Sequence, residues 1–288
     1  MDATQADGDT LNKQRLLVLR DVMTLLDVNW TFDHDAEPIH ALFEWNSSKA
    51  ARTFRCNATT NLSSLRFTVQ ACLQGEPNAE RLRSLDELNA QWGIGRVYYD
   101  AEQQHFDISG GLFLGTGLPA PIILRALLAH LVDGTVQIQN MSVPKFAVTH
   151  APERTYSLQN VFDVLIETGL RPQHRPERNR VGVRVALSPT QDFVFEFELD
   201  DNNCLRVGVL ENNPVALVND DSVIEHLQSV NRGLDFGTVY YDRANGRFVF
   251  LMVIPLAWFP IDSSMIRWIM QQSISVMTKL QLDMERFS

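Results

Sequence analysis

The sequence has few features of a secreted, membrane or disulfide-bonded protein. It contains three cysteines, Cys56, Cys72 and Cys204, which are far apart and form no C-x-x-C pair. This usage favours buried thiols in a reducing compartment over disulfides. Residues 1–13 are polar and acidic and lack the basic and apolar regions of a secretory signal. We therefore expect a cytoplasmic protein.

Positive charge and long apolar runs are also scarce. The chain has 25 Lys and Arg against 35 Asp and Glu, which gives a formal net charge of -10. Nucleic acids and anionic membranes attract basic surfaces, so neither is an expected partner. The longest apolar run, residues 248–260, is shorter than a helix that crosses a bilayer, and it contains Pro255. No transmembrane span is expected.

An internal repeat dominates the rest of the sequence. Residues 88–100 (LNAQWGIGRVYYD) recur as residues 230–242 (VNRGLDFGTVYYD), an offset of 142 that also holds for the apolar positions of the flanking helices. Such a conserved spacing predicts one module present twice. We place the modules at residues 14–140 and 156–286, and residues 141–155, which contain two prolines, as the linker.

Each copy is expected to run helix, strands, helix, two-stranded hairpin, helix. Alternating apolar residues such as Leu65, Phe67 and Val69 predict strands with one buried face, and short turns between strands favour antiparallel pairing. The predicted fold class is α+β, a tandem duplication of a module with a mostly antiparallel sheet packed by helices. In the first copy we expect helices at 14–26, 80–91 and 121–132 and strands at 30–33, 41–45, 52–58, 64–73, 96–99 and 105–108.

The repeated string carries a family resemblance. Residues Asn89 to Asp100, with a helix before them and a strand pair and a helix after, resemble the YbjN-like family of bacterial proteins, and Asn231 to Asp242 resemble it again. That family is described as sensory-transduction regulators, with a fold similar to type III secretion chaperones, which hold other polypeptides. The resemblance implies a chaperone-like role and transfers no catalytic residues. Because those chaperones work as dimers, it also implies a monomeric pseudo-dimer, with a homodimer as the alternative.

No recognised catalytic, cofactor or metal motif occurs. His34, Asp35, Glu37 and His40 surround Pro38 and have the composition of a turn, and their spacing matches no known metal site. The histidines are scattered, and no Gly-x-Ser-x-Gly elbow accompanies them. We expect no enzyme activity, no cofactor and no metal. Four glycines before the last helix of the first copy, without a following Gly-Lys-Ser/Thr, predict a flexible loop: Gly110, Gly111, Gly115 and Gly117.

Two features remain as candidate partner-binding surfaces. A basic cluster, Arg171, His174, Arg175, Arg178 and Arg180, is either a docking site for an acidic peptide or a solvated loop. Aromatic residues around the last helix form either an exposed apolar patch or part of the core. Trp268 lies off the stripe of apolar residues that is predicted to face the core. The candidate partner-binding residues are Trp258, Phe259, Trp268, Arg171, Arg175 and Arg178.

Together these features predict a non-enzymatic cytoplasmic protein of protein-binding or chaperone-like regulatory function. Its expected partner is another polypeptide. A small-ligand sensor with a pocket at the module interface is the alternative, because interfaces between modules often provide such pockets.

Overall fold

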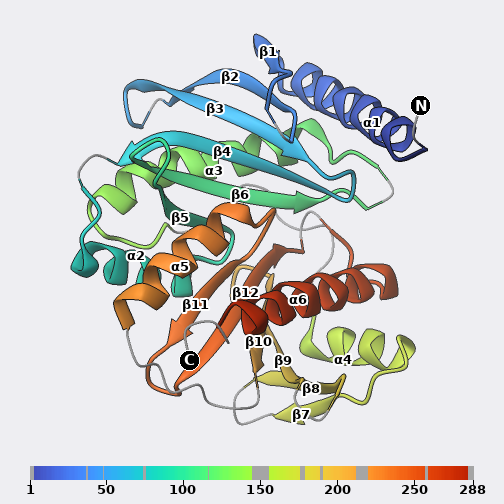
Figure 1. Ribbon diagram of the computed structural model, residues 1–288. Helices are drawn as coiled ribbons and strands as arrows, with labels where there is room; N and C mark the ends of the chain where they lie inside the picture. Colours follow the sequence, from blue (N-terminus) through green and yellow to red (C-terminus); the bar gives the residue numbers. More distant parts are fainter. Residues whose placement is uncertain are drawn as a thin grey trace. The chain divides into compact units, whose positions relative to one another are not determined.

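The structure is a computed structural model of the 288-residue chain (Figure 1). It describes residues 3–36, 38–47, 49–73, 76–115, 117–144, 156–175, 179–188, 191–211, 220–256 and 259–284. The chain forms two compact units. The first unit comprises Met1–Pro77, Gly95–Pro144 and Arg232–Phe236, and the second comprises Asn78–Ile94, Lys145–Asn231 and Gly237–Ser288.

The first unit contains a six-stranded antiparallel sheet. Its strand order is β1-β2-β3-β4-β6-β5. Helices α1 (Ala3–Leu26) and α3 (Pro121–Gln139) pack against the sheet and against each other. Apolar side chains between the helices and the strands form the core, among them Leu19, Met23, Phe67, Ile108, Leu127 and Leu131. The strands are β1 (Trp30–Asp33), β2 (His40–Ser47), β3 (Arg52–Thr60), β4 (Ser64–Leu73), β5 (Gly95–Asp100) and β6 (His105–Phe113).

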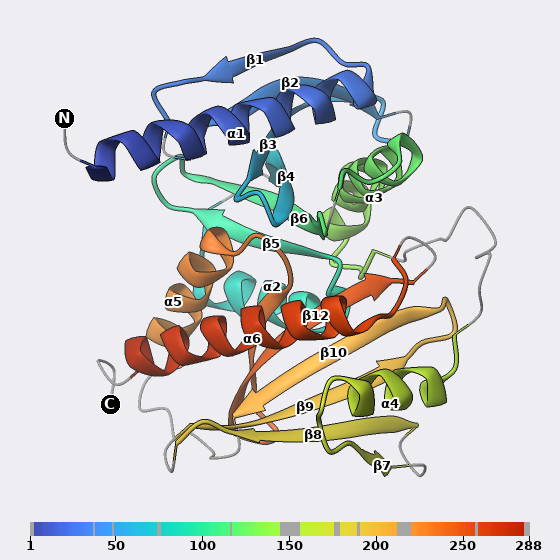
Figure 2. The same ribbon diagram turned by 90° about the vertical axis from the view of Figure 1, so that its right-hand side faces the viewer.

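The second unit repeats this arrangement. Its sheet runs β11-β12-β10-β9-β8-β7, which is the order of the first sheet with each strand replaced by its repeat equivalent. Figure 2 shows α4 (Leu158–Glu167) and α6 (Ser263–Met284) over one face of this sheet. The strands are β7 (Gln173–Arg175), β8 (Arg180–Ala186), β9 (Asp192–Leu199), β10 (Cys204–Glu211), β11 (Thr238–Asp242) and β12 (Arg247–Pro255).

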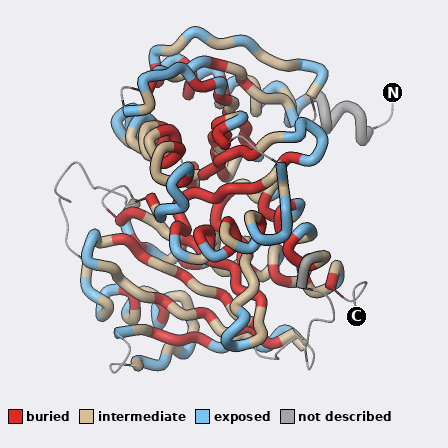
Figure 3. Tube along the Cα trace, turned by 90° about the vertical axis from the view of Figure 1, so that its left-hand side faces the viewer, coloured by how far each residue is buried: buried red, intermediate tan, exposed pale blue. Residues whose placement is uncertain are grey.

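The α+β class and the duplication are confirmed by these two sheets. All strand pairs are antiparallel, and buried positions concentrate along the central strands of each sheet (Figure 3). Equivalent ring pairs recur in the two hairpins. The centroids of Tyr99 and Phe106 are 5.0 Å apart, and those of Tyr241 and Phe248 are 5.2 Å apart. The shared register therefore extends to side-chain packing.

The compact units differ from the consecutive modules that the repeat predicts. Helix α2 (Ala79–Trp92) comes from the first repeat but belongs to the second unit, where it packs beside β11. Residues 232–236, which end and follow α5 (Asp220–Gly233) of the second repeat, belong to the first unit. A helix that connects two strands of one sheet in sequence can pack its apolar face against another unit. The periodicity of its apolar residues does not reveal which unit that is. The expected linker lies largely outside the described residues, which resume at Tyr156.

Local signals set the two ends of α2. Asn78 caps α2, because its side chain accepts a hydrogen bond of 2.8 Å from the Arg81 backbone N–H. The helix ends at Gly93, which has a φ of 67°. Gly95 is the first residue of β5.

Other predictions for single residues have mixed outcomes. The three cysteines are buried free thiols, as expected. The glycine-rich stretch is not all loop, because Gly110 and Gly111 lie within β6 and pair with Phe67 and Arg66. Helix α3 is long and apolar enough to cross a membrane by length and composition. Eight of its residues are buried inside the structure, however, which is the pattern of a core helix.

Candidate functional site

The residues proposed as a partner-binding basic cluster are partly neutralised. Arg175 lies on β7, and its Nη1 is 3.5 Å from Glu196 Oε1. Arg180, predicted as part of the same loop, begins β8 and contacts both Glu196 and Glu198. Arg171 is exposed, and Arg178 lies outside the described residues. The sequence did not predict this pairing, because the two glutamates lie on β9, far along the chain.

The described aromatic candidates are neither fully buried nor fully exposed. Phe259 and Trp268 are both half-buried, and neither is among the large apolar side chains that the described surface exposes. On α6, Ile266, Ile269 and Met277 form the expected buried stripe. Trp258 lies outside the described residues.

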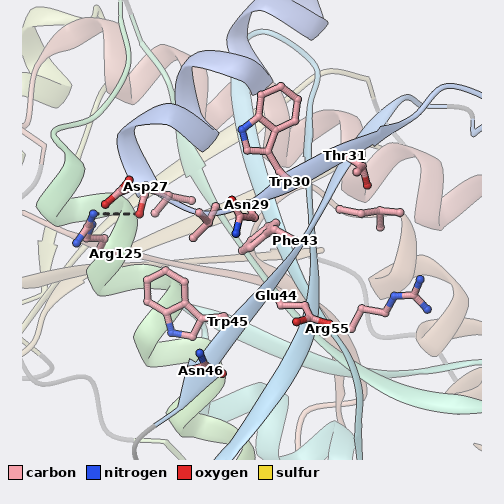
Figure 4. A pocket seen from close by; sticks show the side chains of 13 residues that line it. Asp27, Asn29, Trp30, Thr31, Phe43, Glu44, Trp45, Asn46, Arg55 and Arg125 are labelled. Carbon is pink, nitrogen blue, oxygen red and sulfur yellow. Dashed lines mark hydrogen bonds between the residues drawn. The ribbon is translucent and has the colours of Figure 1, made fainter.

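A hollow of about 740 Å³ lies at an edge of the first sheet (Figure 4). It is lined by the α1–β1 connection, by the far part of β2, and by Arg55 and Arg125. Trp30 and Trp45 lie on two sides of it in Figure 4, and both rings are half-buried. The Arg125 guanidinium donates a hydrogen bond of 3.0 Å to the Leu26 carbonyl, which fixes the end of α1 at the rim.

The hollow coincides with a strand edge that is only half covered. Strand β1 pairs with β2 from His40 to Phe43, and β2 continues to Ser47. Within the described residues, no strand pairs with Glu44–Ser47 on the side opposite β3. A strand edge presents backbone N–H and C=O groups that can pair with another chain. The sequence predicted both strands, but strand lengths alone did not predict their unequal overlap.

A second hollow, of about 500 Å³, lies on the face of the second sheet opposite α4 and α6. Its lining is rich in charge, with residues from β7, β8, β9, β10, β11 and β12. The central position on β10 is Gly208, and a Cβ atom added there would meet no other atom within 4 Å. Sequence analysis missed this site, since its residues are distributed over five strand pairings.

A buried polar cluster in the first unit holds residues 232–236. Arg66 Nη1 donates to the carbonyls of Arg232 and Leu234, at 2.8 and 3.0 Å, and fully buried Arg96 also donates to the Leu234 carbonyl. Burial lowers the pKa of Arg96 to about 9, and the neighbouring Arg66 adds to the effect. These donors satisfy carbonyls at the end of α5, so the cluster has a structural role.

A carboxylate close to this cluster has a raised pKa. Burial raises the pKa of Asp107 to about 6, although the Ala71 backbone N–H and His105 oppose the rise. Asp107 Oδ1 is 2.9 Å from the His105 Nε2. Perturbed groups of this kind occur in active sites and in structural networks alike. The Cys72 thiol lies near Asp107, but burial and that carboxylate raise the pKa of Cys72 well above its ordinary value, which makes it a poor nucleophile. We assign the pair no catalytic role.

The histidine-rich turn and the rest of the described chain show no metal centre. His40 Nε2 is 3.6 Å from Asp33 Oδ2, at the β1–β2 pairing. Glu37 lies outside the described residues. In the part of the chain that the structure describes, no three His, Cys, Asp or Glu side chains gather as metal ligands. No family model, curated protein or solved structure matches this chain.

Proposed function

We propose that the protein is a non-enzymatic, cytoplasmic binding protein whose first unit holds an extended segment of another polypeptide. The uncovered edge of β2 beside the hollow carries this proposal. An extended segment placed along Glu44–Ser47 would continue the sheet, an arrangement that proteins use repeatedly to bind peptides. The chaperone-like, regulatory role implied by the resemblance to YbjN-like proteins accords with such binding.

The side chains around the edge suggest how a segment would be held. Backbone hydrogen bonds provide affinity that depends little on sequence, and pockets for alternate side chains provide selectivity. Trp30 and Trp45 offer two large aromatic surfaces within one hollow, and tryptophan is enriched among residues that dominate binding energy. Arg55, Arg125, Asp27 and Glu44 add charges of both signs. We therefore expect a preference for segments with a bulky apolar residue.

The equivalent edge of the second unit provides a matched control. Strand β7 covers only Arg180–Gly182, so that edge is also open. The sheet registers place Val185 at the position of Trp45 and Pro172 at the position of Trp30. The second edge therefore has the open backbone without the aromatic pair.

The test is to select binders from a displayed library of random peptides and then to measure their affinity for the full chain. Trp45→Ala should weaken binding at least tenfold, which is about 1.4 kcal/mol, whereas Val185→Ala should leave it unchanged. Hydrogen exchange should show that the bound peptide protects backbone amides within Glu44–Ser47. Binding that survives Trp45→Ala and leaves those amides unprotected would refute the proposal.

A further inference from the structure

The hollow on the second sheet has an excess of positive charge in an acidic protein. Four arginines and three carboxylates line it, together with Tyr240 and four apolar residues. The whole chain has a formal net charge of -10, so a locally positive cavity is unusual for its composition. The charged lining residues are Arg175, Arg180, Arg206, Arg247, Glu196, Glu198 and Asp242.

The three carboxylates are occupied by other partners. Glu196 and Glu198 accept from Arg180 at 2.8 and 3.1 Å, and Glu196 is also paired with Arg175. Asp242 accepts hydrogen bonds from the backbone N–H groups of Ala244 and Asn245, in the turn between β11 and β12.

Two arginines therefore remain available. Among the described residues, the side chain of neither Arg206 nor Arg247 has a hydrogen bond or a carboxylate within 4.0 Å. The Nε of Arg247 is buried without a hydrogen-bond partner. Native proteins usually satisfy buried donors, so this atom points to a group, such as a ligand or water, that completes the site.

In the first unit, the arginine equivalent to Arg206 has hydrogen-bond partners within the chain. The sheet registers place Arg66 of β4 at the position of Arg206 of β10, and Thr68 at the position of Gly208. Arg66 donates to two backbone carbonyls, at 2.8 and 3.0 Å. Among the residues that the structure describes, no such acceptor contacts Arg206, and a Cβ atom at the nearby Gly208 would meet no atom within 4 Å.

Tyr240 supplies a neutral donor at the same place. Burial raises the pKa of Tyr240 to about 12, Asp242 adds to the rise, and Arg206 opposes it. The phenol is therefore protonated at neutral pH and can donate a hydrogen bond beside the guanidinium.

We propose that this hollow binds a small organic anion, whose carboxylate or phosphate group is held by Arg206 and Tyr240 in the space above Gly208. Guanidinium groups bind both kinds of oxyanion through paired, charge-assisted hydrogen bonds. Val194, Leu210, Val249 and Leu251 line the remainder and would contact the carbon skeleton. The volume of about 500 Å³ lies in the usual range for small-molecule sites. The site is on the other unit from the β2 edge and takes a different class of ligand.

The test is calorimetric titration of the full chain with three probes, namely succinate, inorganic phosphate and neutral succinamide. Succinate or phosphate should bind and succinamide should not. Arg206→Met should weaken anion binding at least tenfold. Gly208→Thr installs the residue of the first unit and fills the space, so it should abolish binding without lowering the melting temperature. Arg171→Ala removes the same charge from an exposed position outside the hollow and should change affinity less than twofold.

A fourth probe, an acetylated pentaglutamate peptide, distinguishes a small anion from acidic side chains of another protein. Binding of that peptide alone, with no binding of succinate or phosphate, would overturn the proposal. So would anion binding that is unchanged in both Arg206→Met and Gly208→Thr.

Discussion

The two units have the same strand order, but they differ in where a glycine makes room for close packing between a strand and an incoming segment. In the first unit, residues 232–236 approach β6 at Gly111, where a Cβ atom would overlap the Asp235 carbonyl oxygen. In the second unit the strand carries Val253 at the equivalent position, and the approaching residue is Gly93. One glycine is present at each contact, on the strand in one unit and on the incoming segment in the other.

Polar contacts accompany the packing in each unit. In the first unit, the Ser64 hydroxyl donates a hydrogen bond of 3.0 Å to the Asp235 carboxylate. The guanidinium of Arg66 donates to backbone carbonyls that precede Asp235. In the second unit, buried Asn231 binds both the N–H and the C=O of Val239, at 2.8 and 2.9 Å. In both units these bonds keep polar groups near the packed segments hydrogen-bonded.

This comparison teaches that the two repeats have become complementary rather than interchangeable. Valine on the strand opposite a bulky segment residue would clash, and two glycines would leave a gap. Each compact unit also contains residues from both repeats. Neither repeat alone therefore contains all the residues of one compact unit.

The largest expected effect is on folding of the separated halves. With a protease site introduced within residues 145–155, the cut chain should remain a one-to-one complex in size-exclusion chromatography. Each half purified in urea and refolded alone should lack a cooperative unfolding transition, because neither half contains a complete unit. Mixing the halves should restore the transition. Two separately folded monomers after cleavage would contradict the exchange of segments.

A smaller but still large effect is expected for Gly111→Val, which places the residue of the second unit on β6. The new side chain must displace the backbone at Asp235, so the free energy of unfolding should fall by about 3 kcal/mol or more. Urea denaturation provides the measurement. Gly208→Val is the matched control, because a side chain at that strand position meets open space. Equal losses for the two variants would show that the contact with Asp235 is unimportant.

The next prediction concerns the asparagine of the repeated motif. Asn231→Ala should lower the free energy of unfolding by about 2 kcal/mol, because it leaves the buried N–H and C=O of Val239 without their side-chain partner. Asn245→Ala, in the exposed turn of the same hairpin, is the control and should cost less than about 1 kcal/mol. A loss at Asn231 no larger than at Asn245 would contradict this role.

Much of the fold could be predicted from the sequence because local patterns encode it. The alternation in Leu65, Phe67 and Val69 identified a strand with a buried face, and the structure buries all three side chains. The repeat offset predicted equivalent elements, and the hairpins β5–β6 and β11–β12 lie at that offset. These features depend on residues close together in sequence.

Features that depend on long-range pairing could not be predicted. The pairing of Arg180 with Glu196 and Glu198 requires the register of β8 on β9. The open edge at Glu44–Ser47 follows from the shorter length of β1. The need for glycine at residue 111 becomes visible only when Asp235 is placed beside it. Each of these depends on spatial neighbours that composition and periodicity do not specify.

The last prediction concerns the two equivalent helices α2 and α5. At one buried position α2 has Asp86 and α5 has Gln228. Burial raises the pKa of Asp86 to about 7, against opposition from Arg243 and from the Tyr241 backbone N–H. Gln228 is neutral, so its burial does not carry the free-energy cost of burying an ionised carboxylate. Asp86→Asn therefore makes the first helix resemble the second.

The sign of the pH effect follows from proton binding. Folded Asp86 keeps its proton up to about pH 7, whereas an unfolded aspartate loses it near pH 4, about its ordinary value. Between these values the folded chain binds more protons, so its stability falls as pH rises, by up to about 1.4 kcal/mol per pH unit. Asp86→Asn should remove this contribution, and exposed Asp201→Asn should not. Urea denaturation of the three proteins between about pH 4 and 8 measures the difference, and parallel curves for wild type and Asp86→Asn would rule out a buried, protonated Asp86.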